Sequence, residues 1–567
     1  MKKVIPVVVA IALILIVFGM SFGKTVYEKY SYGQDWADLN EYFEIFGIDD
    51  VPIILNNERI DKSARIIDGV YYFDQDTVET YFTERFYVDT NEELLLYSTP
   101  ETTLETVLES GKVTDVLSGE VKDYNYPISV YKDDTLYIAI EYIKNIVGFS
   151  YEPFVEPNRM QLYLEDSDIT VAKIKSDTQV RWRGGVKSEI LTEVSQGDVV
   201  TVIEAMDDWT KVKTSDCYIG YVENSKLTSE TTDRIVIDKC TYSEDFSYLT
   251  RDYKINMTWH NIEYPQDGYG LIEALATAKA VNVVSPTWYW ITDNEGNFSS
   301  VANPNYAKTA HDMDIEVWAL ISDFHSGVEG LDMNELLSYT SKRRAFVDNL
   351  VNTLINDGAD GVNIDFENIS KACAPHYVQF IRELTIACHA NNLVVSVDNF
   401  VPTEYTAHYN RHSQGEFVDY IVIMGYDEHY KGSAEAGSVS SIPWMQDGIE
   451  NTLKYVPKER VINAVPFYTR VWMTDGGDVT SEAVTMATSQ DFLSRNGLTA
   501  QWNEATYQNY AEISTGGILY QVWLEDADSM EVRLNVMEAA GIAGIASWKL
   551  GQETPDIWDL IEGYMSR

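Results

Sequence analysis

The stretch that most constrains the fold runs from residue 358 to residue 369 and reads GADGVNIDFENI. Side chains alternate between the two faces of a β-strand, so one face of this stretch is apolar and the other is polar. The apolar face holds Val362, Ile364 and Phe366, and the polar face holds Asn363, Asp365 and Glu367. Helix-like runs at 343–357 and 374–390 flank the stretch, which predicts a parallel sheet that is buried on both faces.

The two carboxylates of this strand are expensive to bury. An Asp and a Glu two residues apart lose several kcal/mol unless they are hydrogen-bonded, share a proton or serve a function. A solvated strand end with incidental acids is the alternative. Because carboxylates with perturbed pKa values gather at functional sites, Asp365 and Glu367 mark the centre of a candidate active site.

Alternating strand and helix patterns extend over residues 233–567 and predict a (β/α)8 TIM barrel, an α/β fold. A doubly wound open sheet is the rival architecture. No Gly-x-Gly-x-x-Gly turn follows an early strand, and polar residues gather at the carboxyl ends of many strands, which favours the barrel. The expected strands are 255–258, 280–285, 315–321, 361–366, 393–397, 420–424, 461–465 and 544–548.

Acids and large aromatic residues stand at the carboxyl ends of these strands. Aromatic faces stack on sugar rings, carboxylates bind hydroxyl groups, and one acid protonates a leaving oxygen, so the set is typical of a sugar site. Each residue alone is as easily explained by core packing. The set comprises Trp259, Trp288, Asp323, Asp365, Glu367, Asp398, Tyr426, Asp427, Tyr468, Arg470 and Trp548.

The segment DGVNIDFE, residues 360–367, resembles the Asp-x-x-Asp-x-Asp-x-Glu signature of glycoside hydrolase family 18, the chitinase-like enzymes. MGYD at 424–427, YTR at 468–470 and Trp548 match the family in order and spacing. A bacterial branch that includes spore-cortex and peptidoglycan N-acetylglucosaminidases is more similar. The segments resembling that branch are SPTWY at 285–289, NIDFEN at 363–368, YDEHY at 426–430 with IPW at 442–444, and WKLG at 548–551.

Two features depart from the chitinase pattern. Asn363 stands where many chitinases have the middle Asp, which removes one charge beside Asp365. The third strand, around residues 318–323, lacks the Ser-x-Gly-Gly of many chitinases. Both departures weaken the case for chitin as the substrate.

The resemblance implies a substrate-assisted retaining mechanism, which requires neither a protein nucleophile nor a cofactor or metal. Glu367 is then the general acid, with a pKa raised by burial and by Asp365. Asp365 orients the substrate's 2-acetamido group, and Tyr426 donates a hydrogen bond to its carbonyl oxygen. The expected substrate-binding residues are Asn363, Asp427, Trp548, Arg470, Trp288, Trp259 and Tyr468.

A metal site is the other chemical interpretation of these acids. His260, His325 and His429 lie near strand ends, so a His–carboxylate site is conceivable. None of these three histidines has another histidine two or four positions away, which disfavours the metal site.

Residues 167–229 contain five short strand patterns with glycine punctuation, which predict a small β-barrel. The Gly-Asp-x-Val turn, the WTKV strand at 209–212 and the closing GYV at 220–222 resemble the bacterial Src-homology-three-like domain. The resemblance implies contact with the peptides of the cell wall. A spacer barrel without a ligand is the alternative, because fold does not fix function.

Residues 32–166 hold two weakly similar α+β units, one at 51–97 and one at 126–164. They resemble the small stalk domain at the N-terminus of copper amine oxidases and of many secreted bacterial proteins. No His cluster accompanies them, so the resemblance to copper amine oxidases implies no copper site in this chain. We expect this domain to hold the downstream domains away from a membrane.

The first 23 residues carry Lys2 and Lys3 followed by an apolar run from Val4 to Met20, the pattern of an export signal. We expect an uncleaved anchor with the lysines in the cytoplasm, and a cleaved signal peptide stays open. A net charge of −47 argues against nucleic-acid binding and suits a surface outside the cell.

Three function classes follow from these patterns. The first is an extracytoplasmic retaining glycosidase that cleaves β-linked N-acetylglucosamine glycans, with peptidoglycan favoured over chitin and host N-glycans. The second is a non-catalytic wall or chitin lectin, against which the retained Glu367 speaks. The third is a surface scaffold with a vestigial barrel, which the intact aromatic strand ends disfavour.

Overall fold

The computed structural model describes residues 5–240 and 245–567, so Lys2, Lys3 and Val4 lie outside the described residues. The chain divides into two compact units. The first comprises Met1–Glu84, Leu108–Lys112 and Asp123–Ser243. The second comprises Arg85–Val107, Val113–Lys122 and Glu244–Arg567.

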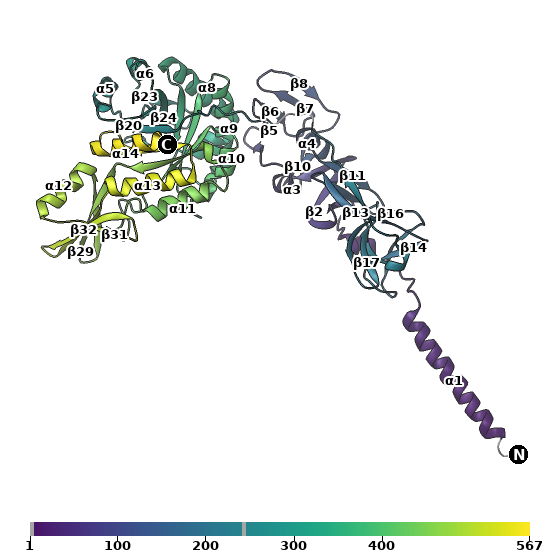
Figure 1. Cartoon of the computed structure of the whole chain (residues 1–567). Helices are drawn as coiled ribbons and strands as arrows, with labels where there is room; N and C mark the ends of the chain where they lie inside the picture. Colours follow the sequence, from purple (N-terminus) through teal and green to yellow (C-terminus); the bar gives the residue numbers. More distant parts are fainter. Residues whose placement is uncertain (1–4, 241–244) are drawn as a thin grey trace. The chain divides into compact units, whose positions relative to one another are not determined.

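The second unit contains a closed barrel of eight parallel strands (Figure 1). Each strand pairs in parallel with the next, and the eighth pairs with the first. The predicted TIM barrel is confirmed, and the open doubly wound sheet is wrong. The strands are β20 Ile255–His260, β21 Val283–Pro286, β24 Glu316–Ser322, β25 Gly361–Asp365, β26 Val394–Phe400, β27 Tyr420–Met424, β28 Val461–Pro466 and β34 Gly544–Trp548.

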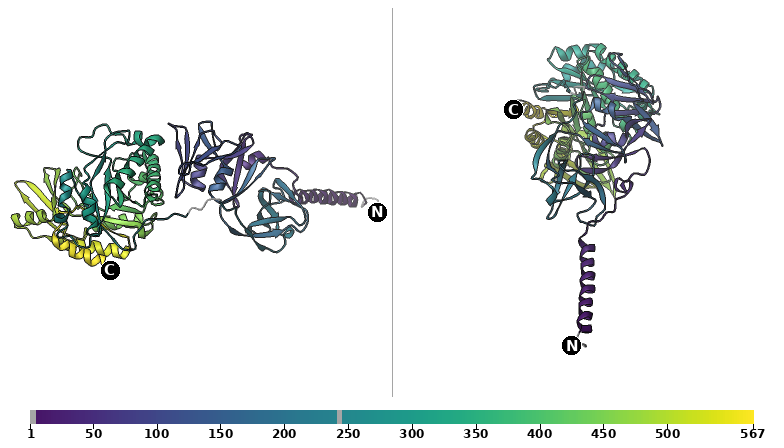
Figure 2. Two further views of the ribbon diagram at one scale, coloured as in Figure 1. Left: turned by 90° about the horizontal axis from the view of Figure 1, so that it is seen from above. Right: turned by 90° about the vertical axis from the view of Figure 1, so that its right-hand side faces the viewer.

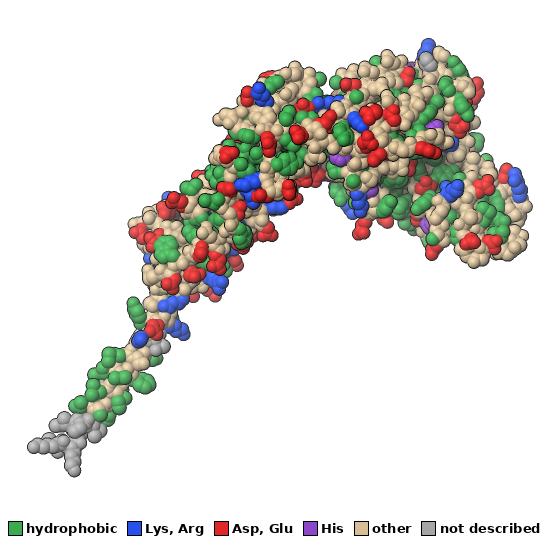
Figure 3. Space-filling model, turned by 180° about the vertical axis from the view of Figure 1, so that it is seen from behind, with side chains coloured by type: hydrophobic (Ala, Val, Ile, Leu, Met, Phe, Trp, Pro, Cys, Tyr) green, Lys and Arg blue, Asp and Glu red, His purple; other side chains and the backbone are tan. Residues whose placement is uncertain are grey.

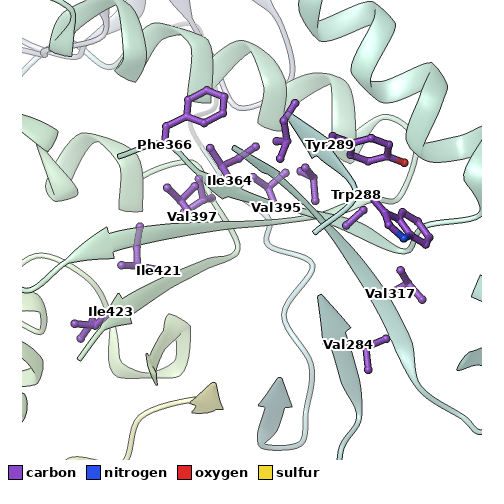
Figure 4. Packing of buried hydrophobic residues seen from close by; sticks show 14 of the residues in the cluster. Val284, Trp288, Tyr289, Val317, Ile364, Phe366, Val395, Val397, Ile421 and Ile423 are labelled. Carbon is purple, nitrogen blue, oxygen red and sulfur yellow. The ribbon is translucent and has the colours of Figure 1, made fainter. Parts of the chain in front are cut away.

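Apolar side chains on the outer face of the strands pack under the surrounding helices, as Figure 4 shows for Ile364, Phe366 and Val397. A smaller cluster, which includes Met257 and Val422, fills the inside of the barrel. The helices are α5 Leu271–Ala274, α6 Pro304–His311, α7 Met333–Ser338, α8 Thr340–Asp357, α9 Ala374–His389, α10 Arg411–Gly415, α11 Ile442–Thr452, α13 Ala527–Ala540 and α14 Pro555–Met565, with the short 3-10 helices η2 Pro265–Gly270, η3 Ala407–Tyr409 and η4 Lys458–Arg460.

Helices α8 and α9 flank the central strand β25, as the sequence pattern predicts. Helix α8 ends at Gly358, which takes the left-handed conformation with φ of 75° and donates its N–H to the carbonyl of Ile355. Glycine adopts this conformation without a Cβ penalty, so it terminates the helix and directs the chain into β25.

Two additions interrupt the barrel. A hairpin follows β21, formed by β22 Tyr289–Ile291 and β23 Phe298–Ser300. A five-stranded antiparallel sheet with one helix separates β28 from α13, and the sequence patterns anticipated only its first residues. Its elements are β29 Tyr468–Asp475, β30 Asp478–Thr485, α12 Met486–Asn496, β31 Gln501–Asn503, β32 Gln508–Thr515 and β33 Ile518–Trp523.

The first unit contains two seven-stranded sheets. One sheet belongs to the α+β region: β1 Asp50–Leu55, β2 Glu58–Ile67, β3 Val70–Asp74, β9 Ser129–Lys132, β10 Thr135–Ala139, β11 Ser150–Phe154 and β12 Arg159–Tyr163, with α2 Leu39–Phe43, α3 Gln75–Tyr81 and α4 Ile140–Ile146. The other is the predicted small β-barrel region: β13 Ser167–Lys173, β14 Thr178–Arg181, β15 Ile190–Val194, β16 Val199–Ala205, β17 Trp209–Lys213, β18 Ile219–Glu223 and β19 Thr231–Ile235, with η1 Asn224–Lys226.

The chain begins with one continuous helix, α1 Ile5–Tyr30 (Figures 1 and 2). Within the described residues, its segment Val8–Tyr30 is the one helix long and apolar enough to cross a membrane, judged by length and composition alone. A signal sequence has the same features. Apolar side chains cover the face of α1 that is visible in Figure 3.

A third sheet differs from the expected stalk of two similar units. The five strands β4 Phe86–Asp89, β5 Leu94–Ser98, β6 Thr103–Val107, β7 Lys112–Asp115 and β8 Val121–Asp123 form a meander that we call the clasp sheet. Most of it groups with the barrel, although segment 94–97 was expected to close the first stalk unit. Hairpin patterns are local, so they do not tell which larger body a meander joins.

The clasp sheet binds both helices that flank β25. The buried Asp89 carboxylate accepts hydrogen bonds from the backbone N–H of Thr340, at 2.7 Å, and from its hydroxyl, at 2.6 Å, which caps α8. The Tyr87 hydroxyl lies 2.6 Å from Nδ1 of His376 on α9. The two helices are also joined directly, because Arg343 on α8 and Glu383 on α9 form a buried ion pair at 3.1 Å.

We predict that Asp89→Ala destabilises the second unit by about 1–3 kcal/mol, because the two buried donors of Thr340 lose their acceptor. Asp89→Asn keeps an acceptor oxygen and costs less. Calorimetric unfolding of the full chain measures the effect. The matched control is Asp38→Ala, which removes the exposed N-cap of α2 in the first unit and leaves the transition of the second unit in place. Equal effects of Asp89→Ala and Asp38→Ala on that transition contradict the assignment.

Candidate active site

A cavity of about 580 Å³ lies at the carboxyl ends of β20, β21, β24, β25 and β34. This size falls within the range of small-molecule sites, and the carboxyl face is where TIM barrels carry their active sites. Its lining includes Asn261, Tyr264, Trp290, His325, Asp365 and Trp548.

Asp365 ends β25 and points into this cavity. Its side chain is buried, and its Oδ1 atom has no hydrogen-bond partner among the described residues. Burial, together with the nearby carboxylates of Asp398 and Glu367, raises the pKa of Asp365 well above its usual value. The group therefore favours its protonated form and keeps one oxygen available to a ligand.

Asn363 is not among the residues that line the cavity, and its expected contact with substrate stays a prediction. The residue is fully buried. Its Oδ1 accepts the indole N–H of Trp259 at 2.8 Å, and its Nδ2 donates to Oδ1 of Asp398 at 2.8 Å. Asn363 thus orients the side chain of Asp398. The buried carboxyl group of Asp398 in turn raises the pKa of Asp365.

Many chitinases have an Asp at the position of Asn363. In this chain the second buried carboxyl group near Asp365 comes from Asp398 instead. It stands on β26 and is buried. Burial raises the pKa of Asp398 well above its usual value, and the hydrogen bond from Asn363 opposes this rise. Because the carboxyl groups of Asp365 and Asp398 are buried and interact with each other, they favour a state in which they hold or share a proton.

Glu367 lies two residues after Asp365, which ends β25 and lines the cavity. Its backbone N–H donates to Oδ1 of Asp323 at 2.9 Å, and the N–H of Asn368 donates to Oδ2 at 2.8 Å, so Asp323 fixes this turn. Partial burial, with the charges of Asp323 and Asp427, raises the pKa of Glu367 to about 7. About half of the Glu367 carboxyl groups then carry a proton at neutral pH, which suits a general acid.

Tyr426 and Asp427 follow β27, and Tyr468 begins β29. The Tyr468 hydroxyl donates to the Asp427 carboxylate. Burial and the nearby Asp398 and Asp365 raise the pKa of Tyr426 well above its usual value, so its hydroxyl stays a hydrogen-bond donor. Gly425 permits the close approach to β28, because a Cβ there would lie 2.7 Å from the carbonyl oxygen of Ala464.

Two of the predicted tryptophans have different places. Trp548 is half-buried and lines the cavity. Trp259 is buried inside the barrel and supports Trp548 in an edge-to-face contact, with ring centroids 5.6 Å apart. The expected substrate contact of Trp259 stays a prediction, and the contact that the structure shows is its packing against the cavity-lining Trp548.

Trp288, which the sequence pattern places among the substrate-binding residues, does not line the cavity. It is fully buried in the outer core, where it packs edge to face on Tyr306 at 5.3 Å (Figure 4). Strand β21 ends at Pro286, so the alternation expected for the strand does not continue to Trp288. Trp290, two residues on, lines the cavity and stacks on the His325 ring at 4.0 Å.

Arg470 lies on β29 and is half-buried. Its Nη1 donates to the Ser481 hydroxyl on β30 at 3.2 Å, and its Nε is buried without a hydrogen bond among the described residues. It is not among the residues that line the cavity.

Two acids at the site, Asp323 and Asp398, belong to the strand-end set of the sequence analysis but were assigned no catalytic or binding role there. Asp323 and Asp398 stand at strand ends, so the strand-end rule was sufficient to find them. Three cavity-lining residues were not expected to contact substrate. Trp290 lies on the inserted strand β22, and His325 and Tyr264 lie in loops whose path no periodic pattern describes.

Three histidines were the candidates for a metal site. Among residues 5–240 and 245–567, no group of three or more His, Cys, Asp or Glu side chains is arranged to hold an ion. His260 lies 2.9 Å from the Tyr306 hydroxyl, His325 stacks on Trp290, and Nδ1 of His429 lies 2.9 Å from the carbonyl oxygen of Ser438. The three rings thus have separate partners.

Comparison with known proteins gives two family matches. The model described as glycosyl hydrolases family 18 matches residues 217–553, and the model described as bacterial SH3 domain matches residues 176–228. The uncharacterized glycosylase YvbX of Bacillus subtilis (strain 168) is 22% identical over 259 residues, which cover 44% of this chain and 74% of that protein.

The cortical fragment-lytic enzyme of Bacillus subtilis (strain 168) is 27% identical over 238 residues. The match covers 40% of this chain and 54% of that enzyme, so it spans about half of the relative's length. The crystal structure of a chitinase from Chromobacterium violaceum ATCC 12472 has a TM-score of 0.50 and 20% identity, covering 55% of this chain and 99% of the chitinase. This structural likeness shows the fold.

The placement of the two tryptophans can be tested by truncation. We predict that Trp288→Ala destabilises the second unit by about 3–5 kcal/mol, because it leaves a cavity in the outer core. Trp290→Ala costs about 1 kcal/mol, because the ring is half-buried and mainly stacks on His325. Urea unfolding measures both values, and a larger loss for Trp290→Ala contradicts the placement.

Proposed function

The chain belongs to glycosyl hydrolase family 18 and is a glycosidase, and from this premise we propose that it hydrolyses β-linked N-acetylglucosamine glycans with retention of configuration. The proposed substrate is peptidoglycan, and the proposed location is outside the cytoplasm. The observation that carries the proposal is the position of Glu367, two residues after the buried, cavity-lining Asp365, in a turn that Asp323 fixes through the Glu367 backbone N–H.

The proposed first step uses the substrate's own acetamido group as nucleophile, as in the substrate-assisted exceptions to the two-carboxylate scheme. Asp365 holds the acetamido N–H with its unpartnered Oδ1, and Tyr426 donates to the acetamido carbonyl oxygen. That oxygen attacks the anomeric carbon and the glycosidic C–O bond breaks. Glu367 gives its proton to the leaving oxygen.

The second step returns the enzyme to its starting state. The Glu367 carboxylate takes a proton from water, and the resulting hydroxide oxygen bonds to the anomeric carbon from the face that the leaving group vacated. The bond between the anomeric carbon and the acetamido oxygen breaks, and the acetamide is restored. Two inversions at one carbon give net retention.

Four features support a cell-wall substrate. A relative in the matched region is named a cortical fragment-lytic enzyme, and the SH3 match at 176–228 is of a bacterial type. An apolar helix, α1, is the first element of the described chain, and the net charge of −47 suits a solvated extracellular surface.

The proposed organisation follows from these features. Residues 1–23 are a signal or anchor in the membrane, 32–166 a stalk, 167–229 a wall-binding barrel and 233–567 the hydrolase. The clasp sheet, within the stalk range, is the part that groups with the hydrolase.

Glu367→Gln tests the role of the acid. We predict a loss of about 10²–10⁴ in kcat, because the amide cannot protonate the leaving oxygen, while glycan binding persists. Release of reducing ends from purified peptidoglycan and from N-acetylglucosamine oligomers measures the loss, and NMR of the first product gives its anomeric configuration. Glu450→Gln, an exposed change on α11, is the matched control. Tight binding without turnover by the unaltered protein identifies a lectin instead.

The pH dependence tests the environment of the same acid. The pKa of Glu367 is raised to about 7, so the protonated form is present below that pH and is lost above it. We expect kcat/KM to fall on the alkaline side with a midpoint near pH 7.

Asp427→Asn removes a negative charge that favours the proton on Glu367, so the alkaline limb moves to lower pH. The Asn side chain still accepts the Tyr468 hydroxyl, which preserves the loop. Asp478→Asn, an exposed change on β30, is the control that leaves the midpoint in place. An unchanged midpoint in Asp427→Asn contradicts the proposed electrostatic coupling.

A further inference from the structure

A second cavity, of about 530 Å³, adjoins the first. Phe324 and His325 line both cavities, so these two side chains form the partition between them. The second cavity, which we call the side cavity, is enclosed by the loop from Asp323 to Asn334 and by residues 368–373 after β25. It has the volume of a small-molecule site in its own right.

The side cavity is directly connected to the catalytic turn. Asp323 lines it and accepts the backbone N–H groups of Glu367 and Asn368. Phe324 in the partition is 43% exposed, so a group leaving the first cavity passes over an open aromatic face and not through a sealed wall. A substituent on a sugar beside Glu367 can therefore reach the side cavity.

The lining of the side cavity combines three kinds of group. Val328, Leu331 and Met333 give apolar surface, and Asn334 and Asn368 give side-chain amides. The backbone N–H of Asn334 donates to Oδ1 of Asp332, and its side chain lines the cavity, where the amide can meet a ligand. Methyl groups next to amide bonds, as in a short peptide, match this combination.

The charges of the two cavities are one-sided. Asp323 and Asp332 line the side cavity, and among the described residues that line either cavity none is Lys or Arg. A free carboxylate placed there meets like charges without a cation to pair with, which is unfavourable at short range. An amide-linked substituent carries no such charge at the same position.

We propose that the side cavity receives the amide-linked lactyl-peptide branch that alternate sugars of peptidoglycan carry, an inference that rests on the proposed function. Each muramic acid residue bears a lactyl ether whose carboxyl group forms an amide with the peptide. The lactyl and alanyl methyl groups lie on the apolar residues, and the amide groups meet Asn334 and Asn368. An unbranched N-acetylglucosamine chain leaves the side cavity unused.

Three glycans of matched length separate the contributions. The first is intact peptidoglycan strands with peptide, the second is the same strands after amidase treatment, which leaves free lactyl carboxylates, and the third is N-acetylglucosamine oligomers. We expect kcat/KM for the peptide-bearing glycan to exceed that for the stripped glycan by about tenfold. The stripped glycan is the poorest of the three, because its carboxylates face Asp323 and Asp332.

Two substitutions in the full-length protein test the side cavity. Asn334→Trp fills it, and we expect the tenfold preference for the peptide-bearing over the stripped glycan to fall to about twofold. Asp332→Asn keeps the cap of α7, whose first N–H groups it accepts, but removes the charge, so hydrolysis of the stripped glycan improves relative to the peptide-bearing one. Asn349→Trp, an exposed change on α8, is the matched control for the added ring.

The outcomes are distinct. Equal rates on peptide-bearing and stripped glycan, or a preference unchanged in both Asn334→Trp and Asp332→Asn, overturn the inference while hydrolysis itself upholds the proposed function. No hydrolysis of any of the three glycans by the unaltered protein overturns the proposed function together with the inference. Asp332→Asn is nearly isosteric, so its result stands even if Asn334→Trp does not fold.

Discussion

The cost of burying carboxyl groups inside a parallel barrel organises this structure. Asp365 and Asp398 stand on neighbouring strands, and burial raises the pKa of both. Asn363 holds Asp398 and is itself held by the indole of Trp259, which also supports Trp548. Stability alone favours apolar residues at such positions. The pair Asp365 and Asp398 instead suits a functional site. It holds ionisable protons near Glu367 and leaves Oδ1 of Asp365 without a hydrogen-bond partner among the described residues, so that a ligand can bind it.

The parts predicted from the sequence are those governed by periodic patterns. All eight barrel strands appear near their expected positions, and Val362, Ile364 and Phe366 face the outer core because a strand alternates its side chains. The sequence pattern did not predict which side chains reach the cavity beyond the end of β21. Trp288 follows the end of β21, so the chain turns it into the outer core and brings Trp290 to the cavity. Spacing alone does not encode that turn.

Asn363 and the clasp sheet show a second limit. Asn363 lies on the predicted inward face, yet whether an inward side chain meets solvent depends on its depth in the barrel, which the strand register fixes only after closure. Asp89 and Thr340 are 251 positions apart and make one of the best-defined contacts of the second unit. Because the clasp sheet contacts α8 and α9, the helices before and after β25, a segment far from the barrel in sequence supports the catalytic strand from behind.

The distribution of charge links the mechanism to the substrate. Burial, with the charges of Asp323 and Asp427, raises the pKa of Glu367, the proposed general acid. The same negative charges disfavour an anionic ligand, and none of the described residues lining either cavity is a Lys or Arg that offsets them. A wall glycan whose lactyl carboxyl groups are amide-linked presents neutral groups to this region. We therefore expect the negative charges that raise the pKa of Glu367 also to favour a glycan whose lactyl groups are amide-linked.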